Sequence, residues 1–372
     1  MPKYREVYLE KDKTLADSGT ETIEIATADP ISEIELKFYA VNGATSNKGN
    51  PIARVVTKIE VFDGSDKLFS MDGRLATALY CYQSHGGYRE TQNEAPLYTK
   101  GIRIPLRFGR WLWDPLYALI PQSFRNLQLK VSWNLAEVRA VGATGFGTGT
   151  AKMSVIVKVM EGLEAPPVGF FMSKDHYAFT SAGSGEERIA LPTDHPYVSV
   201  LMRAWETGID VSESITNLKL SLDHDKDIPF DIAASDAVAQ LLEKYGEFNF
   251  SIFAFGDDAE AHEVWFGSAS AALATAQSAG IICAATALSG GKVTMSQLTH
   301  AGVAQNGLTF FLLVAGQALY HAIYREFGDV EDPTTWLNAP DHGDIKLILT
   351  QGNAGAETNV VLTQARAYAV AA

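Results

Sequence analysis

The sequence predicts an all-β chain made of two tandem β-sandwiches, and three observations support this prediction. Short segments rich in β-branched and aromatic residues recur along the 372 residues, with turn residues between them. Two adjacent prolines, Pro166 and Pro167, divide the chain into near-equal halves, and proline is excluded from central strands because it has no N–H to donate. The two halves also repeat one order of elements.

The expected elements follow from the periodicity of apolar residues. In the first half we expect strands at residues 22–25, 34–38, 55–62, 102–108, 127–133 and 154–160. In the second half we expect strands at residues 189–191, 197–202, 215–220, 248–255, 308–314, 345–349 and 359–368. Helical periodicity is rare, and the two best segments are residues 73–83 and 233–245.

The two halves repeat a strand, a charged turn, a short apolar segment and a helix. Thr57 begins the first of these strands and Thr216 begins the second, an offset of 216 − 57 = 159 residues. Later, residues 126–131 match residues 344–349 in pattern, and each is followed by a glycine-rich loop and one last strand. We interpret this as a duplicated domain, since the period is far longer than that of a solenoid.

One segment interrupts the symmetry. Residues at about 256–306 lie between two strong strands of the second half and are rich in Ala, Ser, Thr and Gly. Long insertions in compact domains are usually functional or exposed. Within it, Ala269–Gln277 is expected to be helical because alanine has a high helix propensity.

Charge and composition narrow the classes of function. Lys and Arg number 30 and Asp and Glu number 44, so the net charge is −14. Direct nucleic-acid binding is not expected, because it requires a basic face. Cys81 and Cys283 do not make a disulfide framework. The polar start of the chain is not a signal peptide, and no clean membrane span is apparent.

The enzymatic and metal-binding readings are weak, so no catalytic residue, metal or cofactor is expected. None of the eight histidines forms the local pairs typical of metal sites. Asp223, Asp225 and Asp227 alternate as in a calcium loop, but the glycine and glutamate that such a loop needs are replaced by Ile228 and Ala234. The alternative is a solvated turn between two strands.

Arg110, Trp111 and Trp113 are the interface candidates. They belong to the segment Arg-Trp-Leu-Trp-Asp-Pro, in which aromatic rings stand beside charged groups. Such rings anchor subunit interfaces, pack in a core or stack on a sugar. The sequence leaves these three readings open.

One order of segments in the first half resembles a known family. Residues 101–106 form an expected strand that ends near Pro105, residues 116–123 form an expected short helical turn closed by Pro121, and residues 127–131 form the next strand. This order resembles double jelly-roll major capsid proteins of tailless icosahedral viruses of bacteria and archaea, the lineage of the adenovirus hexon. The second half departs from it, since the strand at 308–314 leads into Ala315-Gly316-Gln317 with no proline.

The resemblance implies a fold and its boundaries. The expected fold is all-β, with two tandem eight-stranded jelly rolls, short helices and a long loop insertion in the second roll. The expected domains are an N-terminal arm at residues 1–14, a first roll at 15–165 and a second roll at 168–372. The arm would tie capsomers together or be a frayed end, and the insertion at about 256–306 would form a tower or a clamp.

The resemblance also implies a structural function. Three chains would form a homotrimer of six rolls, a pseudo-hexagonal capsomer that tiles the capsid shell of a virion after synthesis in the host cytoplasm. Its partners would be itself and neighbouring capsomers, and contacts with minor capsid or penton proteins and with an internal viral membrane are left open. The alternatives are a tandem β-sandwich that binds or cleaves carbohydrate and a trimeric viral spike subunit.

Overall fold

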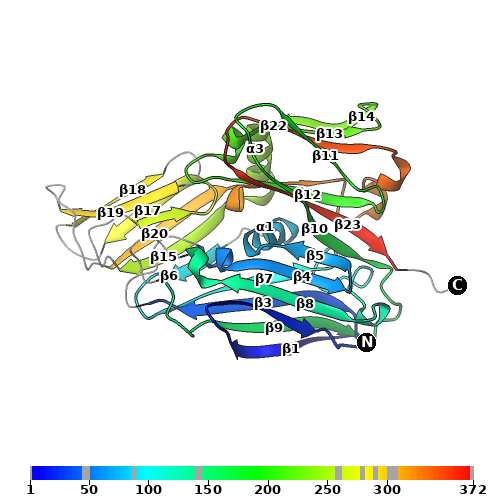
Figure 1. The fold of residues 1–372 in the computed structure, drawn as a ribbon, viewed down its shortest axis with the longest axis horizontal. Coiled ribbons are helices and arrows are strands. Elements are labelled where there is room, and N and C mark those ends of the chain that lie inside the picture. Colours follow the sequence, from blue (N-terminus) through cyan, green and yellow to red (C-terminus); the bar gives the residue numbers. More distant parts are fainter. Residues whose placement is uncertain are drawn as a thin grey trace.

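Two β-sandwiches, one above the other in Figure 1, make up most of the molecule. The computed structural model describes residues 2–43, 51–85, 89–138, 145–255, 262–276, 281–287, 292–299 and 309–368. The first sandwich comprises β1 (Lys3–Thr14), β2 (Ser18–Glu24), β3 (Ile31–Val41), β4 (Val56–Asp63), β5 (Asp66–Met71), β7 (Thr99–Arg107), β8 (Leu127–Asn134) and β9 (Lys152–Glu161). The second comprises β10 (Gly169–Thr180), β11 (Glu186–Ala190), β12 (Tyr197–Trp205), β13 (Ile215–Leu222), β14 (Asp227–Ala233), β21 (Ala322–Glu326), β22 (Ile345–Gln351) and β23 (Glu357–Ala367).

Both sandwiches have the same strand order. The first pairs β1-β9-β3-β7 in one sheet and β2-β8-β4-β5 in the other, and the second pairs β10-β23-β12-β21 and β11-β22-β13-β14. Replacing each strand of the first by its successor in the second gives the second order without exception. Eight strands in two such sheets form a jelly roll, so we call the two sandwiches the first and second rolls. The duplication predicted from the sequence is therefore confirmed.

The correspondence extends to single residues. The register shift in β1 between Tyr8 and Glu10 recurs in β10 between Asp175 and Tyr177, 167 residues later. The shift in β4 between Val56 and Lys58 recurs in β13 after 215 − 56 = 159 residues. Bulges re-aim a strand and are specific features of a fold. Their repetition gives an exact alignment of the two rolls.

Alternation of side chains explains why these strands form. In β8, Leu127, Leu129, Val131 and Trp133 are buried while the residues between them are half-buried, as expected for a strand with one face on a core. All nine residues of β12 are buried, because it lies between a core on one face and the other roll on the other.

A further sheet is contributed by both halves. Its order is β17-β20-β15-β6, and a three-stranded sheet β16-β19-β18 lies beside it at the left in Figure 1. These strands are β6 (Arg89–Asn93), β15 (Phe248–Phe255), β16 (His262–Trp265), β17 (Ser268–Ala276), β18 (Ile281–Ala287), β19 (Lys292–Thr299) and β20 (Thr309–Gln317). The expected insertion thus contains strands, and its stretches 256–261, 277–280, 288–291 and 300–308 lie outside the described residues.

Helices occupy the connections. The α-helices of the described chain are α1 (Gly73–Gln83), α2 (Val211–Ser214) and α3 (Ala234–Tyr245). The 3-10 helices are η1 (Ile52–Val55), η2 (Pro121–Ser123), η3 (Leu135–Val138), η4 (Leu319–His321), η5 (Pro333–Thr335) and η6 (Ala339–Asp341). Asp72 caps α1, since its Oδ1 accepts from the Leu75 N–H at 2.8 Å. The corresponding residue of α3, Ala233, makes no side-chain cap.

Strand pairing crosses from one roll to the other. β5 pairs in parallel with β10 at Phe69–Ser173 and Ser70–Lys174, which joins four strands of each roll into one eight-stranded sheet. The two prolines lie between the end of β9 at Glu161 and the start of β10 at Gly169. We call the contact of β5 and α1 with β10, β12 and β21 the inter-roll joint.

The expected helix at Ala269–Gln277 is wrong. The structure has strand β17 there, and it pairs with β20 along most of its length. Helix propensity is a weak preference that tertiary pairing overrides, and the apolar strand β20 offers a complete hydrogen-bond ladder.

The expected N-terminal arm at residues 1–14 is also corrected. Residues 3–14 form β1, the edge strand of the first roll, which pairs with β9 from Lys3–Glu161 onward. Val7 and Leu9 pack against the core, whereas Tyr4 and Tyr8 are exposed. Charges on the outward face conceal this alternation in the sequence.

The loop after β7 differs from expectation in two ways. Pro121 begins η2 rather than closing a helical turn, because proline is suited to the first position of a helix. The counterpart of β7 is β21, not the strand expected at 308–314. The loops after β7 and β21 share a motif, Phe108-Gly109…Asp114-Pro115…Pro121 and Phe327-Gly328…Asp332-Pro333…Pro340.

Candidate interface surfaces

Arg110 is held rigidly at the start of the loop after β7. Its Nε and Nη2 donate to Asp114 Oδ2 and Oδ1 at 2.7 and 2.9 Å, a bidentate pair in which both side chains are buried. The hydrogen bond from Asp114 raises the pKa of Arg110. The guanidinium also lies 4.2 Å from the ring centroid of Trp111, which adds a cation–π contact.

This loop contacts the second roll of the same chain. Arg110 Nη1 donates to the Glu331 carbonyl at 2.8 Å. The Tyr117 ring lies 5.6 Å from Phe171 and 5.4 Å from Trp336, both in the second roll. Arg110 therefore lies at a contact between rolls inside one chain.

The two tryptophans have different surroundings. Trp111 is 39% exposed. Trp113 is half-buried, its ring lies 4.9 Å from that of Tyr4, and its N–H donates to Ser32 Oγ at 2.8 Å. Tyr4, Leu116 and Val168 are about half exposed. A role for Trp111 and Trp113 between subunits stays a prediction.

The three aspartates of the candidate ion site are separated by their own hydrogen bonds. Asp223 Oδ1 accepts from the Gly343 N–H at 2.8 Å and Asp223 Oδ2 lies 2.9 Å from His342 Nδ1. Asp225 pairs with Lys219 at 3.1 Å, and Asp227 begins β14. The His342 hydrogen bond lowers the pKa of Asp223. This loop is the turn between β13 and β14.

Two searches of the described residues bear on other kinds of site. No group of three or more His, Cys, Asp or Glu side chains within that part of the chain is arranged to hold a metal ion. Among the helices of the described ranges, none is long and apolar enough to cross a membrane.

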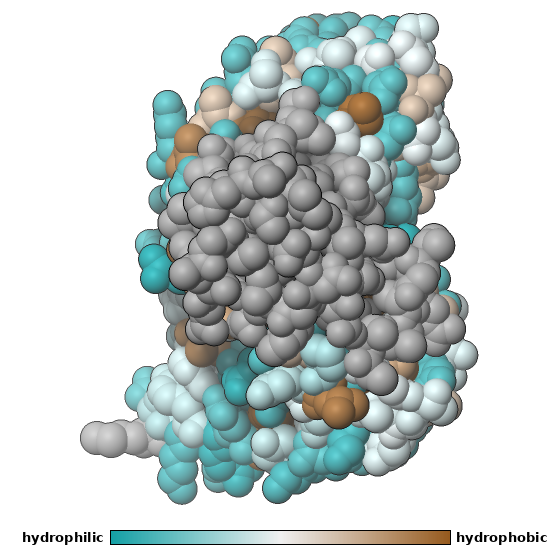
Figure 2. Space-filling view, turned by 90° about the vertical axis from the view of Figure 1, so that its left-hand side faces the viewer, coloured by the Kyte–Doolittle hydropathy of each residue, from teal (hydrophilic) through white to brown (hydrophobic). Residues whose placement is uncertain are grey.

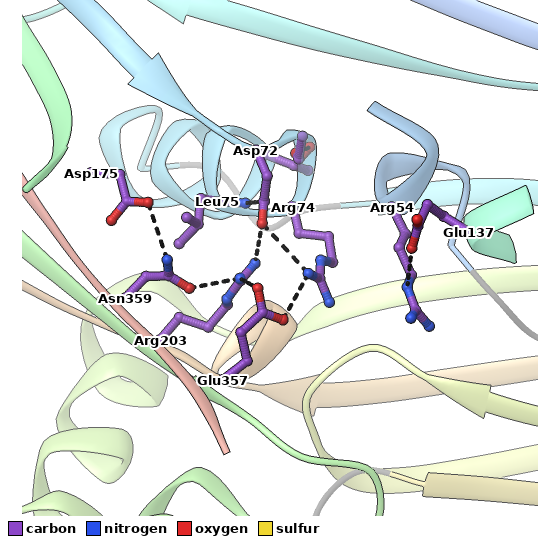
Figure 3. A network of polar contacts seen from close by, with 11 residues as sticks. Arg54, Asp72, Arg74, Leu75, Glu137, Asp175, Arg203, Glu357 and Asn359 are labelled. Atoms are coloured by element: carbon purple, nitrogen blue, oxygen red, sulfur yellow. Dashed lines mark hydrogen bonds and ion pairs between the residues drawn. The ribbon is translucent and has the colours of Figure 1, made fainter. Parts of the chain in front are cut away.

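A buried ionic network fastens the inter-roll joint (Figure 3). Arg203 of β12 is fully buried and donates to Asp72 Oδ2 at 2.7 Å, Glu357 Oε1 at 2.8 Å and Asn359 Oδ1 at 2.7 Å. Arg74 of α1 reaches Glu357 Oε2 at 3.1 Å. Asp72 thus caps α1 and binds the second roll at once. Sequence reasoning missed this network, because its members are far apart in the chain and have no common spacing.

The network shifts the protonation of its acids. Burial favours the neutral form of Asp72, but the charges of Arg203 and Arg74 outweigh burial and hold its pKa below the ordinary value. Burial also raises the pKa of Asp175, which the attraction of Lys58 and Arg203 offsets only in part. Asp72 is therefore ionised in the folded protein.

A cavity of about 640 Å³ opens on the first roll. Its wall comprises the outward side chains of β3 and β7, the side of α1 and the start of β6. Its charged lining residues are Glu35, Lys37, Arg89, Glu90 and Arg103. Arg103 is 67% exposed and bonds Glu35 at 3.3 Å.

The sheet of β6, β15, β17 and β20 has two exposed apolar side chains, Phe253 and Leu313. Phe253 lies 4.8 Å from Phe311, between ring centroids. Figure 2 shows this end of the molecule, where hydrophobic residues are scattered among hydrophilic ones over the coloured surface. Scattered apolar residues are normal on a surface, so we assign no separate site here.

The fold is that of solved viral capsid proteins. The major capsid protein of STIV (Sulfolobus turreted icosahedral virus) matches with a TM-score of 0.58 and 11% identity, over 98% of this chain and 97% of that chain. The major capsid protein P2 of bacteriophage PM2 matches with a TM-score of 0.54 and 9% identity, over 99% of both chains. PBCV-1 VP54 matches with a TM-score of 0.56 and 10% identity, over 98% and 94%.

At these identities the likeness establishes the fold. No protein-family model matches the sequence, and no curated protein is similar to it. The resemblance to double jelly-roll major capsid proteins is confirmed as a resemblance of fold, and the predicted fold class is confirmed with it.

Proposed function

We propose that this chain is a structural major capsid protein that builds the shell of an icosahedral virion. One observation carries the proposal: a double jelly roll that matches viral major capsid proteins over nearly the whole of both chains. Fold alone does not fix function. Here, however, little of either chain is left over to form a separate functional domain.

The proposed assembly is a homotrimer. Two rolls in a chain supply two of the six corners of a pseudo-hexagonal capsomer, and neighbouring capsomers complete the shell. The polar network at the inter-roll joint supports this reading, since it fixes one roll against the other. The chain acts through shape and contacts, and no catalytic residue is assigned. Contacts with minor capsid or penton proteins and with an internal viral membrane belong to the same proposal.

The two alternatives are less well supported. A carbohydrate-active sandwich needs two facing carboxylates in a cleft, and Glu35 and Glu90 in the cavity are held by Arg103 and Gln92. Neither this alternative nor the spike subunit is favoured by the fold comparisons. Capsid assembly is therefore the proposal to test first.

The test is the mass of the purified chain in solution. One chain has a mass of 40.3 kDa, so a trimer has a mass of about 121 kDa, three times that value. We expect light scattering to give this mass at micromolar concentration. A chain that stays monomeric at that concentration contradicts the proposal.

A further inference from the structure

We propose that helix α3 of one copy docks into the cavity on the first roll of another copy, repeating between chains the inter-roll joint found inside one chain. This rests on the proposed function, in which copies assemble side by side. The occupant of the cavity is thus a second copy of this chain.

The joint inside the chain shows what the contact looks like. The Tyr82 hydroxyl of α1 donates to the Ala322 carbonyl of β21 at 3.0 Å, and its ring stacks on Tyr324 at 5.3 Å. Asp72, before α1, binds Arg203 of β12. Helix α1 of the first roll therefore lies against β12 and β21 of the second.

The cavity is the same place on the first roll. Register aligns Lys37 with Arg203, an offset of 203 − 37 = 166, because each pairs with a corresponding residue of the next strand, Arg103 and Ala322. By the same register Pro105 corresponds to Tyr324. Lys37, Arg103 and Pro105 all line the cavity. The positions that α1 covers on the second roll are thus open on the first.

The helix that would fill the cavity is uncovered. Register aligns β5 with β14 and α1 with α3, at an offset of 234 − 73 = 161. On α1 the face toward the second roll is buried, and it consists of Arg74, Leu75, Ala78, Leu79 and Tyr82. The corresponding residues of α3 are exposed, and they are Ser235, Asp236, Ala239, Gln240 and Glu243.

The charges of the two surfaces are complementary. The exposed face of α3 carries Asp236 and Glu243, and the cavity carries Lys37, Arg89 and Arg103 in addition to Glu35 and Glu90. By alignment, Glu243 takes the place of Tyr82 and so faces Arg103. A polar helix face is also what a chain needs if it is soluble before assembly.

The asymmetry holds for the whole chain. Residues 1–165 contain 20 Lys and Arg against 19 Asp and Glu, whereas residues 166–372 contain 10 against 25. Contact between two second rolls brings two strongly acidic bodies together, while contact between a second and a first roll does not. Like-charge contacts suppress wrong pairings. The charge pattern therefore favours head-to-tail contacts, which close into rings.

The edge strands agree with this contact. Inside the chain β5 and β10 pair; their counterparts β14 and β1 are edges of their sheets in the described structure. Phe171 of β10 is 2% exposed, whereas its counterpart Tyr4 is 52% exposed. The internal pair Ser70–Lys174 corresponds to Asp231 of one copy and Val7 of the next.

Charge reversal with rescue tests the contact directly. We expect Glu243→Arg alone and Arg103→Glu alone to weaken association at least about tenfold, because each places like charges together. The double variant Glu243→Arg/Arg103→Glu should restore association to near wild type. Glu186→Lys, on the far edge strand β11, is the control and should change little. Failure of the double variant to recover, with each single variant folded, overturns the proposal.

Disulfide trapping is the second measurement. Paired strands lie about 4.8 Å apart, within reach of a disulfide. Val7→Cys/Asp231→Cys should give covalent dimers and trimers on a non-reducing gel, and either single variant should give monomers. Ser70→Cys/Lys174→Cys is the matched control, because the same joint inside one chain should give a cross-linked monomer.

These outcomes separate the two proposals. A trimer that shows neither charge rescue nor cross-linking overturns the α3 contact and leaves the capsid function in place. A chain that forms no assembly at all removes both.

Discussion

Arg203 is the residue on which the joint between the rolls depends most. Its guanidinium is fully buried and binds three acceptors, two of them carboxylates. We expect Arg203→Met to lower the free energy of unfolding by about 3 kcal/mol, since it leaves the buried Asp72 carboxylate short of a partner. The measurement is chemical denaturation.

The matched control is Arg188→Met. Arg188 pairs with Glu186 on the surface at 2.8 Å, and exposed pairs contribute between about 0 and 1 kcal/mol. Equal losses in the two variants would contradict the importance assigned to the buried network.

Asp72 makes the stability of the joint depend on pH. Its pKa is lowered in the folded protein, where burial is outweighed by Arg203 and Arg74. A carboxyl group with a lowered folded pKa stabilises the fold above its unfolded pKa and loses that contribution as pH falls through the folded pKa.

We therefore expect Asp72→Asn, which keeps the helix cap, to be less stable than wild type above pH 3.8, the ordinary pKa of the group. The difference should shrink as the pH falls below that value. Denaturant unfolding at pH 6 and in acid measures it, with the surface variant Asp341→Asn as control. A difference that does not change with pH would refute this role of the Asp72 charge.

Sequence reasoning at this scale found one part of the joint and missed the other. Arg110, Trp111 and Trp113 stood out because aromatic and charged residues are adjacent in the chain, and Arg110 does contact the second roll. Arg203, Asp72 and Glu357 are separated by more than a hundred residues and have no local pattern. Only the packing of one roll on the other brings them together.

The paired loops after β7 and β21 are the element whose geometry is most constrained. A Cβ added at Gly109 would lie 2.3 Å from the Tyr117 carbonyl oxygen, and one at Gly328 would lie 2.2 Å from that of Thr335. Gly328 also has a φ of +82°, which disfavours other residues.

We expect Gly109→Ala and Gly328→Ala each to cost about 2 kcal/mol or more, because the backbone must shift in both loops. Thermal unfolding measures this. Gly183→Ala is the control, since an added Cβ there meets nothing within 4 Å. Tolerance of both loop substitutions would contradict the equivalence of these loops.

Elements with strong periodicity were predicted well. Residues 73–83 form α1 and residues 248–255 form β15, both with the expected bounds. β1 was missed because Lys, Arg and Glu on its outward face hide the inward Val7 and Leu9. The Phe-Gly…Asp-Pro…Pro motif in both loops was a signal in the sequence that would have identified β21 as the counterpart of β7.

At the scale of the whole molecule, duplication explains both the fold and the proposed assembly. One roll repeats the other strand for strand, and the two are joined by a sheet that runs through both. What the sequence did not give was the relation of one roll to the other, because this depends on the short β5–β10 pairing and on buried charges.

Electron microscopy of the purified assembly tests the central claim most directly. We expect averaged images with six lobes of similar size around a centre, two from each of three chains, as the pairing of like rolls head to tail requires. A particle with an uneven set of lobes, or one with twofold symmetry through two second rolls, would contradict the account.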